Sequence, residues 1–245
     1  MLEIDFLTFA TSNWKESKKR ISSQIESIQK DHNFFRKTAL LNENDLNSKY
    51  IEIFGKYLSD KGYAYYSWKP WIIMEALKNI NNNSYLFYID GGCSFPNGQQ
   101  RDDFLSAIVN KCSEMEKEFI DFGCATTPKH IPVDRTIRME ILKHFNLDND
   151  NFFRKKYPHF QAGMMLIKKT NLSEMIVKQW LDFFIKHYDT MVHVGYEDKF
   201  GQDEHFIHFT GDQAILQCLL YLNHIKVLDC FDPFFTYSVY SRIRK

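Results

Sequence analysis

The sequence predicts an α/β fold with a mostly parallel central sheet. Strand-like apolar runs alternate with amphipathic, helix-like runs from the first residues onward, and this alternation is typical of strands joined by crossover helices. The run YLFYID (85–90) has no alternation of polar and apolar residues before Asp90, as expected of a strand that helices cover on both faces. We therefore expect 85–90 to lie at the centre of the sheet.

Length and composition limit the number of domains and the classes of partner. The chain has 245 residues, 44% of them hydrophobic and 25% charged, which is enough for one substantial core, so we expect a single domain over 1–245. Lys plus Arg and Asp plus Glu both number 31, so no overall field favours nucleic acid or an anionic membrane. The N-terminus shows no export signal, and no stretch reaches the roughly 18 apolar residues that span a bilayer. We expect a cytoplasmic protein with reduced cysteines.

The N-terminal elements follow from apolar spacing. LEIDFLTFA (2–10) predicts the first strand. A helix follows whose apolar residues recur on one face: Trp14, Ile21, Ile25 and Ile28. SKYIEIFGKYLSDKG (48–62) predicts a second helix that ends at Gly62, since glycine takes the left-handed conformation after a last turn at no steric cost.

Pro70 fits the first turn of a third helix over 71–80, because its missing N–H has no partner there anyway. Asp102 can cap a long helix that Gly123 closes. The apolar positions of that helix recur at three and four: Phe104, Leu105, Ile108, Cys112, Met115 and Phe119.

The C-terminal half continues the alternation of elements. An irregular Thr- and Pro-containing segment is expected over 125–133 and a helix over 134–145. Beyond it we expect a strand over 160–169 and a helix over 171–188. A polar His-rich stretch over 189–210 follows, and then a second helix over 211–223 and a last strand over 225–230.

Asp90 is the first candidate for a binding role. Ligands gather at the carboxyl ends of strands in open α/β sheets, and Asp90 ends the most apolar strand. Gly91 and Gly92 follow it and allow a backbone or a ligand to approach closely. Mg²⁺ or Mn²⁺ on a diphosphate takes one or two protein carboxylates. From spacing alone, an aspartate that caps its own turn explains the position equally well.

Two further stretches carry groups suited to binding, one to a phosphate and the other to a sugar ring. Trp68-Lys69-Pro70 comes directly before a helix N-terminus, where free N–H groups favour phosphate, with Lys69 as a point charge and Trp68 as a stacking face. An ordinary proline-initiated helix with a surface lysine is the alternative. Gln161-Ala162-Gly163 combines an amide with two small residues that let a sugar ring lie against the backbone.

Gly211-Asp212-Gln213 opens the helix over 211–223. An acid followed by an amide can bind sugar hydroxyls and support charge at a reacting carbon, although an aspartate at a helix start is also a common cap. The histidines of the polar stretch lack the paired spacing of a zinc site, which favours a polar loop: His187, His193, His205 and His208. Cys93 has no histidine at motif spacing that would make it a nucleophile.

Four of these stretches together carry a resemblance. GYAYYSWKPWIIMEAL (62–77) followed by YLFYIDGGC (85–93) resembles the signature GYGYW-x-WKP-x-I and the Asp-Ala-Gly strand end of bacterial capsular and lipopolysaccharide-type glycosyltransferases. FQAGMMLIKKTN (160–171) and FIHFTGDQAILQCLL (206–220) look like that family's Gln-Ala-Gly strand and its His-Asp-Gln-Ser-Ile-Leu helix. The matches occur in one order and cover most of the chain.

The resemblance implies a GT-A fold, which is a Rossmann-like fold of nucleotide-diphospho-sugar transferases. It places Asp90 at the metal and diphosphate carboxylate, and it places Asp212 and Gln213 at the transferred sugar. The Asp-Gln pair is similar to that of retaining galactosyltransferases of the glycogenin type, an analogy between families. The donor-binding residues it implies are Thr8, Ala10, Asn13, Trp68, Lys69, Asp90, Gly91, Gly92, Gln161, Ala162 and Gly163.

The chain departs from the pattern of that family at three places. Asp90-Gly91-Gly92 lacks the second carboxylate of the Asp-x-Asp motif common in metal-dependent GT-A enzymes, Gly211 replaces a histidine, and TIRME (136–140) matches a Thr-Lys-Arg-Asp helix only loosely. A non-catalytic carbohydrate-binding or scaffold module on the same fold therefore stays an alternative to the enzyme.

The expected activity is transfer of a hexose from a nucleoside-diphosphate sugar, UDP-linked, to a hydroxyl of a capsule or lipopolysaccharide acceptor, with Mn²⁺ or Mg²⁺ as cofactor. The acceptor is a glycan or a lipid-linked glycan. The basic and aromatic segment FFTYSVYSRIRK (234–245) suggests contact with the inner face of the membrane, and a terminal packing segment is the alternative.

Overall fold

The computed structural model describes residues 2–114, 119–121, 132–157, 160, 162–193, 202 and 204–225. Its centre is a five-stranded sheet in the order β2-β1-β3-β5-β4. The strands are β1 (Ile4–Phe9), β2 (Lys37–Leu41), β3 (Tyr85–Asp90), β4 (Phe119–Asp121) and β5 (Met164–Lys168). β1 pairs in parallel with β2 and β3, whereas β5 pairs antiparallel with β3 and β4. Four strands thus share one direction, and the predicted α/β fold with a mostly parallel sheet is confirmed.

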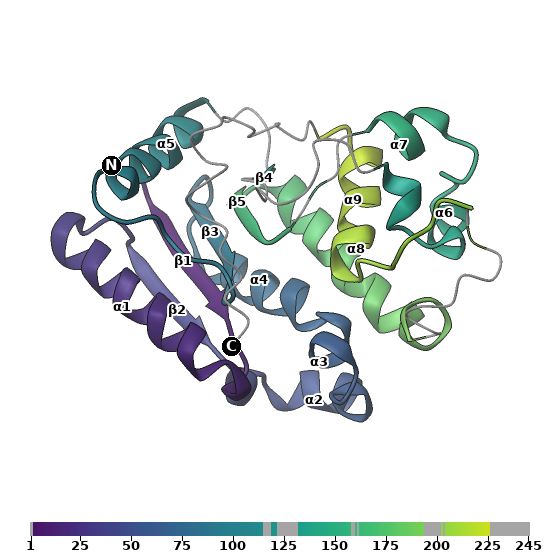
Figure 1. Cartoon of the computed structure of the whole chain (residues 1–245), viewed down its shortest axis with the longest axis horizontal. Coiled ribbons are helices and arrows are strands. Elements are labelled where there is room, and N and C mark those ends of the chain that lie inside the picture. The colour runs from purple at the N-terminus through teal and green to yellow at the C-terminus, as the bar shows by residue number, and fades with distance from the viewer. Residues whose placement is uncertain are drawn as a thin grey trace.

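Helices cover both faces of the sheet (Figure 1). α1 (Lys15–His32) and α5 (Gln99–Glu114) lie on one face, and α4 (Trp68–Asn79), α8 (Asn171–His187) and α9 (Asp212–Leu222) lie on the other. The shorter helices are α2 (Ser48–Phe54), α3 (Lys61–Tyr65), α6 (Met139–His144) and α7 (Asn151–Lys156). No helix among the described residues is long and apolar enough to cross a membrane.

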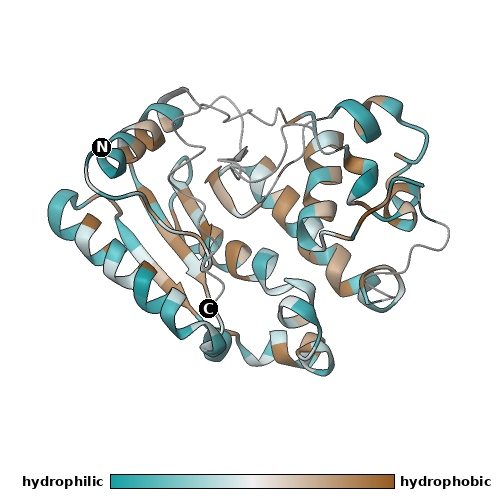
Figure 2. Cartoon of the chain, viewed as in Figure 1, coloured by the Kyte–Doolittle hydropathy of each residue, from teal (hydrophilic) through white to brown (hydrophobic). Residues whose placement is uncertain are grey.

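β3 connects the two cores of the molecule. Tyr85, Phe87 and Ile89 belong to the core under α1 and α5, while Leu86 and Tyr88 belong to the core under α4, α8 and α9. These alternating side chains are all buried, because successive strand residues point to opposite faces. The apolar colouring of the strands between two layers of helices in Figure 2 shows the same arrangement. The expectation that 85–90 is the central strand is confirmed by the strand order.

The helix predicted over 48–62 is wrong in its length and its end. α2 begins after Asn47, whose side chain accepts a hydrogen bond from the Tyr50 N–H, and it ends at Phe54. A 3₁₀ turn follows over Gly55–Tyr57. Gly62 does have a positive φ of 68°, but it opens a turn of its own that leads into α4.

Other boundaries also differ from the prediction. Trp14 lies in a 3₁₀ turn before α1 and is 38% exposed, so it does not share the buried face of Ile21. Asp102 lies in the first turn of α5, which begins three residues earlier at Gln99. Phe119 lies in β4 and not in the preceding helix. The predicted helix over 134–145 is reduced to α6, after a 3₁₀ turn over Val133–Arg135.

Several predicted features fall outside the described residues. These are Met115, Gly123, most of the irregular segment 125–133, part of the polar stretch 189–210, the strand expected over 225–230 apart from Ile225, and the C-terminal segment 234–245. The described elements that were not predicted include the edge strands β2 and β4 and helix α7. β1, α1, α4, β3, β5, α8 and α9 lie where the sequence places them, within a few residues at their ends.

Candidate functional site

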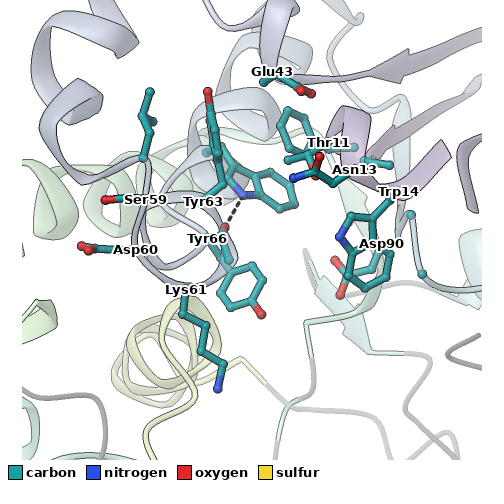
Figure 3. Close-up of a pocket in the computed structure, with 17 residues that line it drawn as sticks. Thr11, Asn13, Trp14, Glu43, Ser59, Asp60, Lys61, Tyr63, Tyr66 and Asp90 are labelled. Atoms are coloured by element: carbon teal, nitrogen blue, oxygen red, sulfur yellow. Dashed lines mark hydrogen bonds between the residues drawn. The ribbon is translucent and has the colours of Figure 1, made fainter. Parts of the chain in front are cut away.

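A cavity of about 690 Å³ opens at the carboxyl ends of β1 and β3 (Figure 3). Four parts of the chain line it: the end of β1 and the turn after it, Glu43, the segment before α4 together with the first residue of α4, and the end of β3. The lining residues are Phe9, Ala10, Thr11, Asn13, Trp14, Glu43, Leu58, Ser59, Asp60, Lys61, Gly62, Tyr63, Tyr66, Trp68, Asp90, Gly91 and Gly92. This is the edge at which ligands bind in open α/β sheets. In the view of Figure 3, Trp14 and Asp90 lie on one side of the cavity and Ser59 and Asp60 lie on the other.

Gly91 brings the ends of the two strands together. Its N–H donates to the Phe9 carbonyl at 3.3 Å. A Cβ atom at Gly91 would lie 2.7 Å from both the Ala10 Cβ and the Phe9 carbonyl oxygen, a separation that atoms in van der Waals contact do not reach. Only glycine therefore allows Asp90 and Ala10 to lie side by side at the base of the cavity.

Lys69 lies beneath the cavity and joins two carboxylates. Its Nζ is 3.1 Å from Asp90 Oδ1 and 2.7 Å from Asp212 Oδ2, and it donates to the Ala162 carbonyl at 3.2 Å. Lys69 and Asp212 are 3% and 4% exposed. Neither side chain lines the cavity. We call Lys69, Asp90 and Asp212 the buried ion cluster.

Burial sets the charges of the buried ion cluster. It raises the pKa of Asp212 to about 6, because the cost of burying the carboxylate outweighs the attraction of Lys69. Burial lowers the pKa of Lys69, but the charges of Asp212 and Asp90 more than offset this, and the net pKa lies above its ordinary value. The buried ion cluster therefore places one ammonium between two carboxyl groups, of which Asp212 has a pKa shifted toward neutrality. Tyr88, whose pKa burial and Asp90 also raise, donates from its hydroxyl to Asp90 Oδ1 at 2.5 Å.

Trp68 forms part of the cavity wall. Its ring stacks on Phe9 with centroids 4.1 Å apart and an interplanar angle of 21°, and its Nε1–H donates to the Gly62 carbonyl at 2.9 Å. The indole thereby ties the end of β1 to the chain segment before α4. Because both contacts hold the ring within the protein, Trp68 offers the cavity a fixed apolar edge.

The chain from Gly62 to Tyr66 forms a left-handed turn, which we call the 62–66 turn. Its five φ angles are 68°, 59°, 59°, 46° and 64°. Left-handed conformation costs a non-glycine residue roughly 1–2 kcal/mol, and four of the five residues carry a Cβ atom. The Tyr66 ring lies directly over Gly62, since a Cβ atom there would be 2.5 Å from its ring carbon Cζ. Such strained backbone persists where surrounding contacts hold it, often at binding sites.

Replacement of Ala64 by glycine tests the strain of the 62–66 turn. The left-handed backbone becomes easier to form, which offsets the loss of a buried methyl group, and we expect a stability within about 0.5 kcal/mol of the unchanged protein. The matched change Ala76→Gly lies in the right-handed helix α4 and should cost about 1 kcal/mol. Urea denaturation measures both. Equal losses for the two variants would contradict a left-handed Ala64.

Polar groups close the rim of the cavity. Ser12 donates from its N–H to both carboxylate oxygens of Glu43, at 2.9 Å and 2.8 Å. Burial raises the pKa of Glu43, but hydrogen bonds, those from Ser12 first, bring the net pKa below its usual range. Across the cavity, Asp60 accepts hydrogen bonds from the Tyr188 hydroxyl at 3.0 Å and pairs with His193 Nδ1 at 2.8 Å. Both rim carboxylates are thus held in place by neighbours.

Most of the predicted site residues fall into two groups. Six of them line the cavity, namely Ala10, Asn13, Trp68, Asp90, Gly91 and Gly92. Lys69, Ala162 and Asp212 meet below it through the buried ion cluster, and the Gly163 carbonyl accepts from the Asp90 N–H at 2.8 Å. Thr8 is 2% exposed within β1 and does not line the cavity. Gln213 opens α9 beside Asp212, and Gln161 lies outside the described residues.

Sequence reasoning missed most of the outer lining. Thr11, Trp14 and Glu43 come from turns after β1 and β2. Ser59 to Gly62 come from the end of the helix predicted over 48–62, and Tyr63 and Tyr66 lie beyond that end. The aromatic repeat GYAYY was the available signal, because Tyr63 and Tyr66 both line the cavity. Both tyrosines lie between two predicted helices, and apolar spacing does not predict a left-handed turn there.

Asp90 is the residue that could hold a metal ion. Its side chain is 24% exposed, and Tyr88 and Lys69 both contact Oδ1, which leaves Oδ2 for a ligand. Among the described residues no group of three His, Cys, Asp or Glu side chains could hold a metal ion. A single protein carboxylate fits Mg²⁺ or Mn²⁺ when a diphosphate and water supply the other oxygens. The donor set therefore suits an ion that arrives with its ligand.

Comparison with known proteins gives structural likenesses only. The sequence matches no protein-family model and no curated protein. A glycosyltransferase involved in the glycosylation of the major capsid of PBCV-1 is 11% identical, with a TM-score of 0.45 over 75% of this chain and 68% of that chain. Mouse xyloside xylosyltransferase 1 is 10% identical, with a TM-score of 0.46 over 94% and 85%. The galactosyltransferase LgtC, in complex with donor and acceptor sugar analogues, is 13% identical, with a TM-score of 0.44 over 88% and 70%. At such values the likeness does not extend to the details of a site.

Proposed function

We propose that the protein is a GT-A glycosyltransferase that moves a hexose from a nucleoside-diphosphate sugar, UDP-linked, to a hydroxyl of a surface polysaccharide acceptor. The observation that carries the proposal is the cavity at the carboxyl ends of β1 and β3 with Asp90 at its base. The ordered motifs over 62–77, 85–93, 160–171 and 206–220 support it, because the cavity and the buried ion cluster draw on three of them and Ala162 of the fourth accepts from Lys69.

The charge of the cavity supports a requirement for a cation. Glu43, Asp60 and Asp90 line it, and in the part of the chain that the structure describes Lys61 is the one lysine or arginine of the lining. A diphosphate would therefore meet an excess of negative charge unless a cation came with it. Mn²⁺ or Mg²⁺ held by Asp90 would neutralise the charge of the leaving diphosphate. Lys69 does not replace such an ion, because it is buried between two carboxylates.

The residues of the chain have separate roles in this proposal. Trp14 and Tyr63 offer faces to the base of the nucleotide, and Asp90 holds the diphosphate end. Asp212 and Gln213 stabilise charge at the reacting carbon once the sugar reaches them. The analogy of the Asp-Gln pair favours retention of configuration, in which the departing phosphate accepts the proton of the acceptor hydroxyl.

Binding of donors tests the proposal directly. With Mn²⁺ present, at least one member of a panel of UDP- and GDP-sugars should raise the melting temperature, since a ligand at about 100 times its Kd stabilises by about 2.7 kcal/mol. Asp90→Ala should remove the shift. Asp103→Ala is the matched control, because Asp103 accepts from Gln99 within α5 and lies outside the cavity lining. If no nucleotide sugar raises the melting temperature of the unchanged protein, the proposal of a donor site is refuted.

A non-catalytic carbohydrate-binding or scaffold module is the second candidate. The lone Asp90 carboxylate favours it, since position 92 is a glycine. Such a module would bind nucleotide sugar or glycan without turnover. Release of free nucleoside diphosphate in the presence of candidate acceptors separates the two, and NMR of the product would then give the linkage and the anomeric configuration. The candidate acceptors should include lipid-linked glycans, because the basic segment 234–245 is proposed to contact the inner face of the membrane, where such acceptors lie.

A further inference from the structure

Tyr66 stands between the cavity and Asp212. The Tyr66 ring lines the cavity, whereas Asp212 and Gln213 do not, and Asp212 is only 4% exposed. Three aromatic rings surround the Lys69 Nζ, with centroids at 5.8 Å for Tyr66, 5.9 Å for Trp68 and 5.5 Å for Tyr88. Of the three, Tyr66 and Trp68 line the cavity. A sugar held in the cavity would therefore meet Tyr66 before it met Asp212.

The same ring touches the start of α9. A Cβ atom at Gly211 would lie 3.6 Å from Tyr66 Cδ2 and 3.4 Å from the Tyr65 carbonyl oxygen. Gly211 itself has a φ of 61°. The 62–66 turn thus packs against the residue directly before Asp212, and a displacement of the turn would uncover the beginning of α9.

The strained backbone of the 62–66 turn favours a change of conformation. Four non-glycine residues in left-handed conformation store strain. Backbone hydrogen bonds hold the turn locally, from the Tyr66 N–H to the Gly62 carbonyl at 3.3 Å and from the Ser67 N–H to the Ala64 carbonyl at 2.9 Å. Ala64 and Tyr65 are buried in the core, whereas Tyr66 is only partly buried and lines the cavity, so its ring is the part of the turn that can move. A ligand that binds better when the turn has moved can shift this balance.

We propose that the Tyr66 ring is a partition between the cavity and Asp212, and that this partition determines which donor sugar the protein accepts. The donor sugar reaches Asp212 and Gln213 only after the 62–66 turn has moved the Tyr66 ring. The inference rests on the proposed function for the identity of the ligand, a nucleoside-diphosphate hexose. It assigns to Tyr66 a positioning role, because the residue acts by controlling access to Asp212.

Labelling of carboxylates tests the partition without any donor. A water-soluble carbodiimide with glycine ethyl ester, followed by peptide mass spectrometry, measures how fast each aspartate reacts. Asp212 of the unchanged protein should react about tenfold more slowly than the exposed Asp31, whose side chain is 42% exposed. Tyr66→Ala should bring the rate of Asp212 close to that of Asp31, and Tyr66→Phe should leave it slow. If Tyr66→Ala leaves Asp212 as slow as before in a protein with an unchanged circular dichroism spectrum, the partition is refuted.

Binding measurements test the role of the partition. By calorimetry, Tyr66→Ala should leave the Kd of UDP within about twofold and should tighten the binding of the matching UDP-hexose about tenfold, because the ring no longer has to be displaced. Equal changes for UDP and for UDP-hexose would refute a role at the sugar. If UDP fails to bind the unchanged protein, the proposed function fails instead, and the labelling result still decides the partition. Tyr66→Leu replaces Tyr66→Ala in both measurements should the smaller side chain prevent folding.

Discussion

Lys69→Met is expected to lower the free energy of unfolding by about 3–5 kcal/mol, because it strands two carboxylates that one buried ammonium now holds. Asp212 loses the contact at 2.7 Å and Asp90 loses the contact at 3.1 Å. Methionine has nearly the length of lysine but carries no charge, so the loss is electrostatic more than steric. Urea denaturation at pH 7 measures it. Donor binding should disappear as well, since Asp90 would no longer be fixed at the base of the cavity.

Two further variants separate the ion cluster from a general loss of packing. Lys56→Met removes an exposed pair with Asp189, whose two side chains are 68% and 63% exposed, and it should leave the stability unchanged within error. Lys69→Met combined with Asp212→Asn removes one of the stranded charges and should recover part of the loss. A double variant as unstable as Lys69→Met alone would contradict the electrostatic explanation.

Gly91→Ala is expected to abolish donor binding and to lower the free energy of unfolding by about 1–3 kcal/mol, as overpacking does. The added Cβ would lie 2.7 Å from the Phe9 carbonyl oxygen and from the Ala10 Cβ. Neither atom is the end of a flexible side chain, so β1 and β3 would have to separate at the edge where Asp90 lies. Thermal shift with the matching nucleotide sugar and urea denaturation measure the two effects.

Gly55→Ala is the matched control for this change. Gly55 has a right-handed φ of −54°, and a Cβ atom there would meet only the Ile51 Cγ2, at 3.5 Å. The alanine should stabilise the protein by about 0.4–1 kcal/mol, through the unfolded chain. Unaltered donor binding by Gly91→Ala would mean that the close approach of the two strands is not needed at the site.

The sequence predicts those elements whose apolar pattern is complete within one segment. β3 is a buried run, and α1, α8 and α9 have an apolar stripe at helical spacing. β2 was missed because KTALL is an edge strand that pairs only with β1 among the described strands, and none of its residues is fully buried. The direction of β5 was likewise not predictable, since its apolar pattern is the same in a parallel and an antiparallel pairing.

The sequence predicts which residues belong to the candidate site better than it predicts how those residues contact one another. Asp90, Gly91 and Gly92 could be placed at a strand end because a carboxylate after a buried run is unusual. The position of Lys69 could not, since a lysine before a helix looks exposed until its partners are known. Those partners, Ala162 and Asp212, come from β5 and α9, and no local pattern reports a contact between segments so far apart.

The buried ion cluster also has a consequence for the order in which the chain matures. During synthesis, Lys69 and Asp90 leave the ribosome long before Asp212, and domains tend to form from their N-terminal side. Of the two carboxylates that contact the Lys69 ammonium, only Asp90 can do so before α9 docks. Docking of α9 then seals the ammonium with a second carboxylate. The ion pair between Lys69 and Asp212 thus forms only once α9 has docked, and it reports that the two distant segments have come together.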